Sequence, residues 1–292
     1  MSKSIQDSVM LPPTDFRCEL TTFTAVRLSL NELAAVRLQP ELRFPAQVTP
    51  QFLKNSDSQT IASLAAVYEA VQSMSQPPAT FREWGVVSAS RYIGRSAFAA
   101  TLHRYQKDGP WGVSVQITPH NLLHSVSSTI SLSLQCQGPC LGAGGGLRSE
   151  VDALLLAANL LTDPARPGVW MTWSYWDPEL QIDEQGKPTS QSSCIAMALA
   201  LQPIHDGDPR SQIAIRTRVN PGTQPAEEGL SSSKSSLASV LLDISRLSPK
   251  AFDVVCQLNG GLELDFSWHS RDIETKHQQP LRPLQTSAGC AQ

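Results

Sequence analysis

Residues 138–161 hold the pattern with the clearest chemical meaning in this sequence. Three consecutive glycines, Gly144, Gly145 and Gly146, lack a Cβ and reach positive φ, so the chain can turn sharply there and another group can approach the backbone closely. Apolar residues then recur at helical spacing over residues 151–161, with Ser149 as the predicted N-cap. A glycine turn that leads into a helix N-terminus presents free N–H groups and the positive end of the helix dipole, which can hold an anion or support a nucleophile.

The glycine turn itself supplies no nucleophile. Leu147 stands at its tip, where covalent catalysis requires a cysteine or a serine. The simplest alternative is a turn that only packs a helix against a sheet. The other side chains that could do covalent chemistry, with a histidine as base, are Ser125, Ser149, Cys140, His120 and His124. None lies in a G-x-S-x-G motif and no ordered acid partner is evident, so a stand-alone enzyme that uses one of them is the alternative hypothesis.

Composition excludes several function classes. The chain has 292 residues, 41% of them apolar and 17% charged, as in an ordinary globular protein. A formal net charge of -3 gives no basic footprint, so we expect no nucleic acid partner. The sequence has neither the roughly 18-residue apolar run of a spanning helix nor the apolar h-region of a signal peptide, so we expect no membrane partner and a cytoplasmic location.

Cysteine spacing argues against a metal site. Cys136 and Cys140 are the only close pair among six cysteines, and no second pair stands at zinc-ligand spacing. We therefore expect reduced, buried thiols, no metal and no cofactor.

Hydrophobic periodicity predicts an α/β protein. We expect strands over residues 16–30, 84–89, 130–136, 169–175, 195–201, 212–219 and 262–268, and helices over 57–74, 95–106, 149–161 and 237–247. The strand at 212–219 is expected to pair with 195–201 across the turn signal at 206–209. Residues 1–15 and 271–292 are expected to be disordered tails, and residues 16–270 a single domain.

The order of these features resembles the N-terminal half of a β-ketoacyl synthase. The features that carry the resemblance are the helix at 58–71, the strand at 85–89, the segment ITPHNLLHSV at 117–126, Gly138-Pro139 with the glycine turn after it, and DAL at 152–154 with Ala157-Ala158. The resemblance covers roughly residues 57–219. It implies a thiolase-like αβαβα layered fold, in which two similar halves pack their sheets around a buried helix.

The sequence departs from this family at the catalytic positions. Counted from Gly138-Pro139, the position of the condensing cysteine falls on Leu147. The active-site histidines of the family lie in glycine-flanked motifs that this chain lacks; His269 and His277 stand in a polar terminus without them. The chain is also expected to be too short for a complete second half.

The resemblance therefore implies a chain-length-factor-like, non-catalytic partner of a ketosynthase in polyketide or fatty acid biosynthesis. Family members form dimers through edge strands just before the Gly-Pro motif, with the acyl tunnel along the interface. Leu122, Leu123 and Val126, together with the glycine turn, are the expected tunnel residues. A charge at Leu132 is expected to break the dimer, which forms with a ketosynthase or with a second copy.

A third possibility is a scaffold that binds acyl carrier protein. The acidic helix of a carrier protein seeks basic side chains. The candidates are Arg91, Arg95, Arg148, Arg216 and Arg218.

Overall fold

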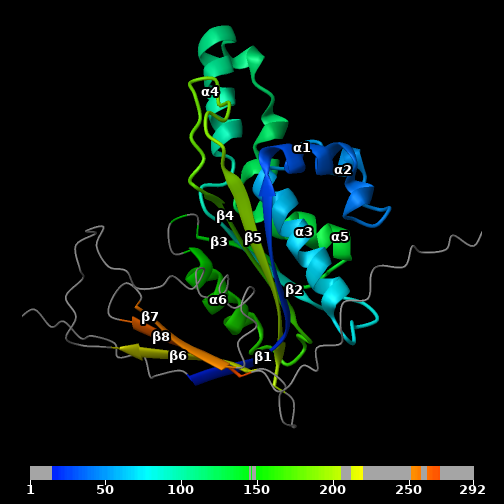
Figure 1. Cartoon of the computed structure of the whole chain (residues 1–292), viewed down its shortest axis with the longest axis vertical. Coiled ribbons are helices and arrows are strands. Elements are labelled where there is room, and N and C mark those ends of the chain that lie inside the picture. The colour runs from blue at the N-terminus through cyan, green and yellow to red at the C-terminus, as the bar shows by residue number, and fades with distance from the viewer. Residues whose placement is uncertain are drawn as a thin grey trace, which may run out of the picture.

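The computed structural model describes residues 15–144, 146, 149–204, 212–219, 251–257 and 262–269 (Figure 1). Its strands are β1 Asp15–Ser29, β2 Gly85–Ser90, β3 Cys140–Ala143, β4 Val169–Asp177, β5 Ser193–Pro203, β6 Gln212–Val219, β7 Ala251–Gln257 and β8 Leu262–His269. Its α-helices are α1 Leu30–Leu38, α2 Pro50–Leu53, α3 Ser58–Ser73, α4 Arg95–Asp108, α5 His124–Leu134 and α6 Ser149–Leu160. Four 3-10 turns complete the described elements: η1 Pro40–Leu42, η2 Pro110–Gly112, η3 Val115–Ile117 and η4 Pro119–Asn121.

The described strands form one eight-stranded mixed sheet in the order β3-β2-β4-β5-β1-β6-β8-β7. β2 is parallel to both β3 and β4, whereas the other pairs are antiparallel. Val87 is the centre of the parallel trio, with Leu141 opposite it in β3 and Met171 in β4. Because these three strands run in one direction, their carboxyl ends meet at one edge of the sheet.

The two faces of the sheet are separated by the alternation of side chains along the strands. Val86 of β2 packs in a core cluster with α3 and α5, whereas Val87 and Ala89 pack in a second cluster with α6. Figure 1 shows α3 and α5 on one side of the sheet and α6 on the other. The described residues thus form a helix–sheet–helix sandwich, the arrangement of one sheet in the expected thiolase-like fold.

The helix α3 is the central helix of the first face. Asp57 caps it, since its carboxylate accepts a hydrogen bond of 2.8 Å from the N–H of Gln59. Eleven of its sixteen residues are buried, so it is packed nearly all round. The sequence predicted this helix correctly.

Three sequence predictions about the fold are wrong. Residues 130–136, predicted as a strand, lie mostly in α5, because Val126 and Ile130 are both fully buried at the i, i+4 spacing of a helix. β6 pairs with β1 and β8 instead of β5, since the long β1 extends past the end of β5. Ser149 is the first residue of α6, not a residue before it. The sequence reading also missed α1 and β7.

Some predictions lie outside the described residues. These are the tails at 1–14 and 271–292 and the helix at 237–247. Among the described helices, none is long and apolar enough to cross a membrane.

Candidate functional site at the carboxyl ends of the parallel strands

The carboxyl ends of β2, β3 and β4 carry the segments of chemical interest. The chain leaves β2 toward α4, leaves β3 through the glycine turn toward α6, and leaves β4 into the loop of residues 178–192. In open α/β sheets, ligands bind beyond the carboxyl ends of the strands. The topology therefore brings the glycine turn, the start of α4 and this loop to the edge where a site is expected.

Gly144 forms the turn after β3. Its φ is +63°, in the left-handed region, and a Cβ built there would lie 2.6 Å from the Cβ of Ser149. Glycine is thus required at this position by both its backbone angle and its neighbour. A Cβ on Gly146 would meet no heavy atom within 4 Å. Gly145, Leu147 and Arg148 lie outside the described residues.

The first turn of α6 does not favour an anion. Glu150 and Asp152 both lie in this turn, where carboxylates already interact with the positive end of the helix dipole. The buried Oγ of Ser149 has no hydrogen-bond partner among the described residues. A serine nucleophile needs a base within hydrogen-bond reach, and Ser149 has none here.

Ser125, the other candidate serine, is buried at the start of α5. Its Oγ also has no hydrogen-bond partner in the described part of the chain, so neither His120 nor His124 is joined to it. An activated Ser–His pair is therefore not formed there.

Cys18, Cys136, Cys140 and Cys194 are free thiols. Burial raises the pKa of Cys18 and that of Cys136 to about 12, and it raises the pKa of Cys194 as well. These three thiols stay protonated near neutral pH, and the thiol is a poor nucleophile. Cys140 is half-buried in β3, with its Sγ 3.7 Å from the Oγ of Ser128.

The predicted tunnel residues lie at the start of α5, against the sheet. The carbonyl of Leu123 accepts a 3.3 Å hydrogen bond from the Oγ of Ser88 in β2. A Cβ on Gly142 of β3 would lie 2.5 Å from the backbone carbon of Leu123, so strand and helix are in direct contact there. The glycine turn begins at Gly144, two residues after Gly142, so Leu123 is close to this turn. Leu122 is exposed, whereas Val126 is fully buried in the cluster with α3.

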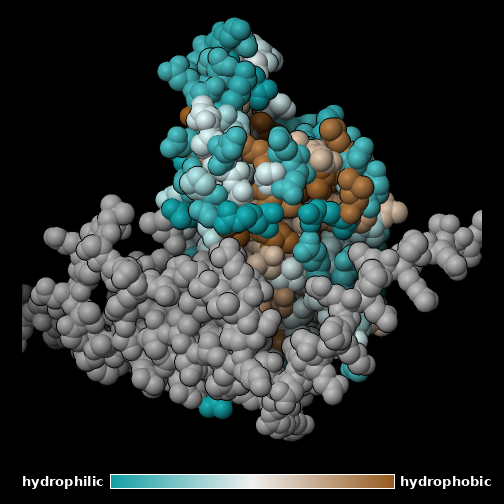
Figure 2. All heavy atoms as spheres, in the orientation of Figure 1, coloured by the Kyte–Doolittle hydropathy of each residue, from teal (hydrophilic) through white to brown (hydrophobic). Residues whose placement is uncertain are grey.

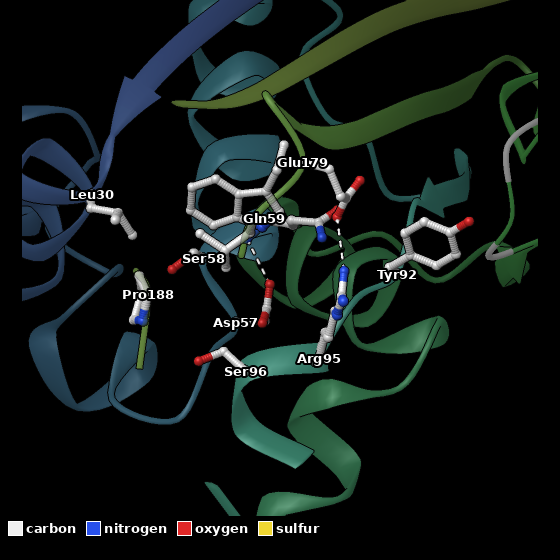
Figure 3. Close-up of a pocket in the computed structure, with 12 residues that line it drawn as sticks. Leu30, Asp57, Ser58, Gln59, Tyr92, Arg95, Ser96, Glu179 and Pro188 are labelled. Carbon is white, nitrogen blue, oxygen red and sulfur yellow. Dashed lines mark hydrogen bonds and ion pairs between the residues drawn. The ribbon is translucent and has the colours of Figure 1, made fainter. Parts of the chain in front are cut away.

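A small cavity lies at the same edge, between the N-terminal ends of α1, α3 and α4 (Figure 3). It encloses about 390 Å³ including its mouth. It is lined by Leu30, Asp57, Ser58, Gln59, Tyr92, Gly94, Arg95, Ser96, Trp176, Glu179, Leu180 and Pro188. This cavity could not be predicted from the sequence, because its walls come from segments far apart in the chain. Arg95 is the lining residue that the sequence had singled out, as a candidate for carrier-protein binding.

Two carboxylates give this cavity its charge. Burial raises the pKa of Asp57, although the N–H of Gln59, the Arg37 guanidinium and the N–H of Gly94 oppose the shift. Glu179 lies 3.6 Å from the Nε of Arg91 and 3.8 Å from the guanidinium of Arg95. Two of the five arginines considered for carrier-protein binding are thus paired with one acid. Arg148 and the side chains of β6 lie outside the described residues.

This chain resembles known proteins in its structure and not detectably in its sequence. The sequence matches no protein-family model and no curated protein. The ishigamide ketosynthase/chain length factor superposes with a TM-score of 0.58 at 13% identity, over 87% of this chain and 99% of the other. The chain has a ketosynthase fold. The thiolase-like fold expected from the sequence is therefore confirmed.

Two further structures show the same fold. A β-ketoacyl synthase from Burkholderia phymatum STM815 gives a TM-score of 0.56 at 9% identity, over 88% of this chain and 100% of the other. The AntDE:AntF complex, a type II polyketide ketosynthase bound to its acyl-carrier protein, gives 0.59 at 10% identity, over 88% and 100%. The likeness thus extends along the whole length of those chains.

Proposed function

We propose that this chain is a non-catalytic ketosynthase-like subunit that pairs with a catalytic ketosynthase and shapes its acyl tunnel. The observation that carries the proposal is the ketosynthase fold, with a glycine turn between β3 and α6. The count from Gly138-Pro139 along the sequence supports it, because it puts Leu147 at the position expected for the cysteine. The described serines near this turn have no base, which supports the same conclusion. Similarity to the ishigamide ketosynthase/chain length factor supports pairing with a ketosynthase.

The free edge of β3 is the proposed centre of the pairing surface. β3 is the first strand of the sheet, so its outer edge has no neighbour among the described strands. An unpaired edge can add a strand from another chain. This edge strand, β3, follows Gly138-Pro139, whereas the sequence predicted an edge strand before this motif. Leu132 is still part of this surface, because it lies on α5, which packs on β3, and is 69% exposed.

The proposed tunnel wall is the start of α5. Leu123 contacts the backbone of β3 at Gly142, next to the pairing edge, and Leu122 is exposed beside it. A wall at this place limits the acyl chain by steric exclusion, since each methylene admitted or refused is worth about 0.8 kcal/mol. Product length is therefore set by the size of the side chains at these positions.

The first test concerns acylation. We expect the purified chain to take up no acyl group from an acyl carrier protein, because the residue at the nucleophile position is leucine and the described serines lack a base. Intact-mass measurement after incubation with acyl carrier protein loaded with a radiolabelled or heavy acyl group checks this. A stoichiometric adduct, at Cys140 for instance, would show that the chain is an acyltransferase.

The second test concerns chain length. In the reconstituted pair, Leu123→Phe is expected to shift the products toward shorter chains, because it adds volume to the proposed wall. Leu42→Phe is the control, since Leu42 is exposed on η1 and is not part of the proposed wall. Mass spectrometry of the products reads out their length. An unchanged distribution from an active pair would exclude the chain-length role and favour a scaffold that binds acyl carrier protein.

A further inference from the structure

A projecting arm, residues 92–122, presents most of the exposed large apolar side chains among the described residues. It consists of α4 and the 3-10 turns η2, η3 and η4, and Figure 1 shows α4 extending away from the sheet. Not one residue of α4 is buried. Trp111 is 97% exposed, Val115 83%, Leu102 62% and Tyr105 53%. An isolated helix of this length is marginal in water, so contacts outside α4 must hold it.

The loop of residues 178–192, here called the strap, supplies contacts on one side of α4. A Cβ on Gly186, at a φ of +78°, would lie 2.5 Å from the N of Ala100 and from the O of Ser96, so the strap is seated directly on the helix. The Ser96 hydroxyl also donates a hydrogen bond to the Gly186 carbonyl. Glu179 of the strap pairs with Arg95 at the first turn. The strap thus fixes the direction of the arm.

The opposite side of α4 carries an apolar row that is exposed in its second half. At 100° per residue, Phe98, Leu102 and Tyr105 all fall about 140–200° from Ala100, on the side away from the strap. Leu102 and Tyr105 are exposed, whereas Phe98 is half-buried. Their i, i+4, i+7 spacing is that of anchor residues that a helix places in a groove of a partner. The arm thus combines a rigid support with an open row of large side chains.

The hydropathy colouring in Figure 2 does not mark this row as apolar. The face drawn there shows the arm as mainly hydrophilic, while hydrophobic residues gather below it, over α1 and α2. Tryptophan and tyrosine have low hydropathy values yet are the residues most often found at the centre of interfaces.

We propose that the arm is a docking limb for the paired ketosynthase subunit, in which Leu102, Tyr105 and Trp111 are the anchors. This inference depends on the proposed function. The arm runs into η4 and α5, and α5 packs on β3, so its surface is continuous with the proposed pairing edge. A carrier protein binds transiently through charge, whereas several large apolar side chains gathered on one limb are typical of a lasting protein interface.

The experiment measures pairing with the catalytic ketosynthase of the reconstituted pair. Trp111→Asp and Leu102→Asp are each expected to weaken the complex about 30-fold or more, as loss of an anchor does. Leu42→Asp, an equally drastic change at an exposed leucine outside the arm, is expected to leave the affinity unchanged. Native mass spectrometry and sedimentation give the affinities. Urea unfolding checks that the arm variants fold as the wild type does, which is expected because their side chains are exposed.

Hydroxyl-radical footprinting tests the same contact without a substitution. Oxidation of Trp111 is expected to fall several-fold in the complex. Equal oxidation in the free and paired chains, or protection by acyl carrier protein in place of the ketosynthase, would overturn the proposal. If the wild type pairs and sets product length while the arm variants pair equally well, only the docking limb is refuted; if the wild type does not pair, the proposed function fails with it.

Discussion

Replacing Gly144 by alanine tests whether the turn after β3 depends on glycine for the reasons that the geometry gives. Two costs add. An alanine in the left-handed region costs roughly 1–2 kcal/mol, and a Cβ 2.6 Å from the Cβ of Ser149 overpacks a buried contact, which typically costs about 1–3 kcal/mol. The reduced freedom of the unfolded chain returns about 0.4–1 kcal/mol. We therefore expect Gly144→Ala to lower the free energy of unfolding by about 1–4.5 kcal/mol.

Gly146→Ala is the matched control in the same turn. Its Cβ would meet no heavy atom of the described residues within 4 Å, and its φ is not in the left-handed region. We expect its free energy of unfolding to stay within about 1 kcal/mol of the wild type, with any change toward greater stability. Urea unfolding followed by tryptophan fluorescence measures both variants, and equal m-values show that the comparison concerns stability alone.

A double substitution tests the steric part of the cost. Ser149→Gly removes the Cβ that an alanine at position 144 would strike, but it leaves the Cα of residue 149, 2.8 Å from the same position, and the backbone angle unchanged. The pair of changes is expected to show a favourable coupling energy of about 1 kcal/mol. If Gly144→Ala were as stable as Gly146→Ala, the reasoning about this turn would be refuted; if the coupling were zero, the contact with Ser149 would be the part in error.

The sequence specified those elements whose pattern has one interpretation. α3 combines a 3.6-residue period with an aspartate cap, and β4 and β5 are short apolar runs, so helix and strands follow directly. These elements needed no information from distant parts of the chain.

α5 shows how a local pattern can mislead. Serines alternate with Ile130 and Leu132, as in a half-buried strand, but Leu132 is exposed. The serine hydroxyls turn back to the carbonyls of the preceding turn: Ser127 donates to His124 and Ser133 to Ile130. Polar side chains satisfied in this way can be buried in a helix, so their alternation no longer marks a solvent face.

Only the part of the site that is continuous in the chain could be predicted from the sequence. The glycine turn is continuous in the chain, so its residues identified it. The cavity and the strap instead join segments near residues 57, 95 and 186, and the β1–β6 pairing joins residues about 200 positions apart. Such contacts are set by packing of the whole fold, which periodicity does not encode.

Three further predictions follow from the charges and surfaces described above. Leu147→Cys is expected to restore no condensation in an enzyme assay, because a thiol alone lacks the base and the oxyanion donors; measurable product would contradict this. Asp57→Asn keeps the cap of α3 but removes a carboxyl whose pKa is raised by burial. Since the pKa of Asp57 is higher in the folded than in the unfolded protein, the wild type loses stability as the pH rises through the folded value. The Asn variant is therefore expected to be at least as stable as the wild type at pH 7, whereas Asp57→Ala loses about 1 kcal/mol. Urea unfolding from pH 3 to 8 measures this, and an Asn variant that is less stable at pH 7 would refute the account. Leu132→Glu is expected to abolish pairing with the ketosynthase without destabilising the free chain, because Leu132 is 69% exposed on α5 and a charge placed in an apolar contact is buried without a partner. Size exclusion of the co-expressed subunits measures the pairing. An intact complex would mean that the outer side of α5 lies outside the interface. The edge of β3 would then lack the helical support on which the proposed pairing depends.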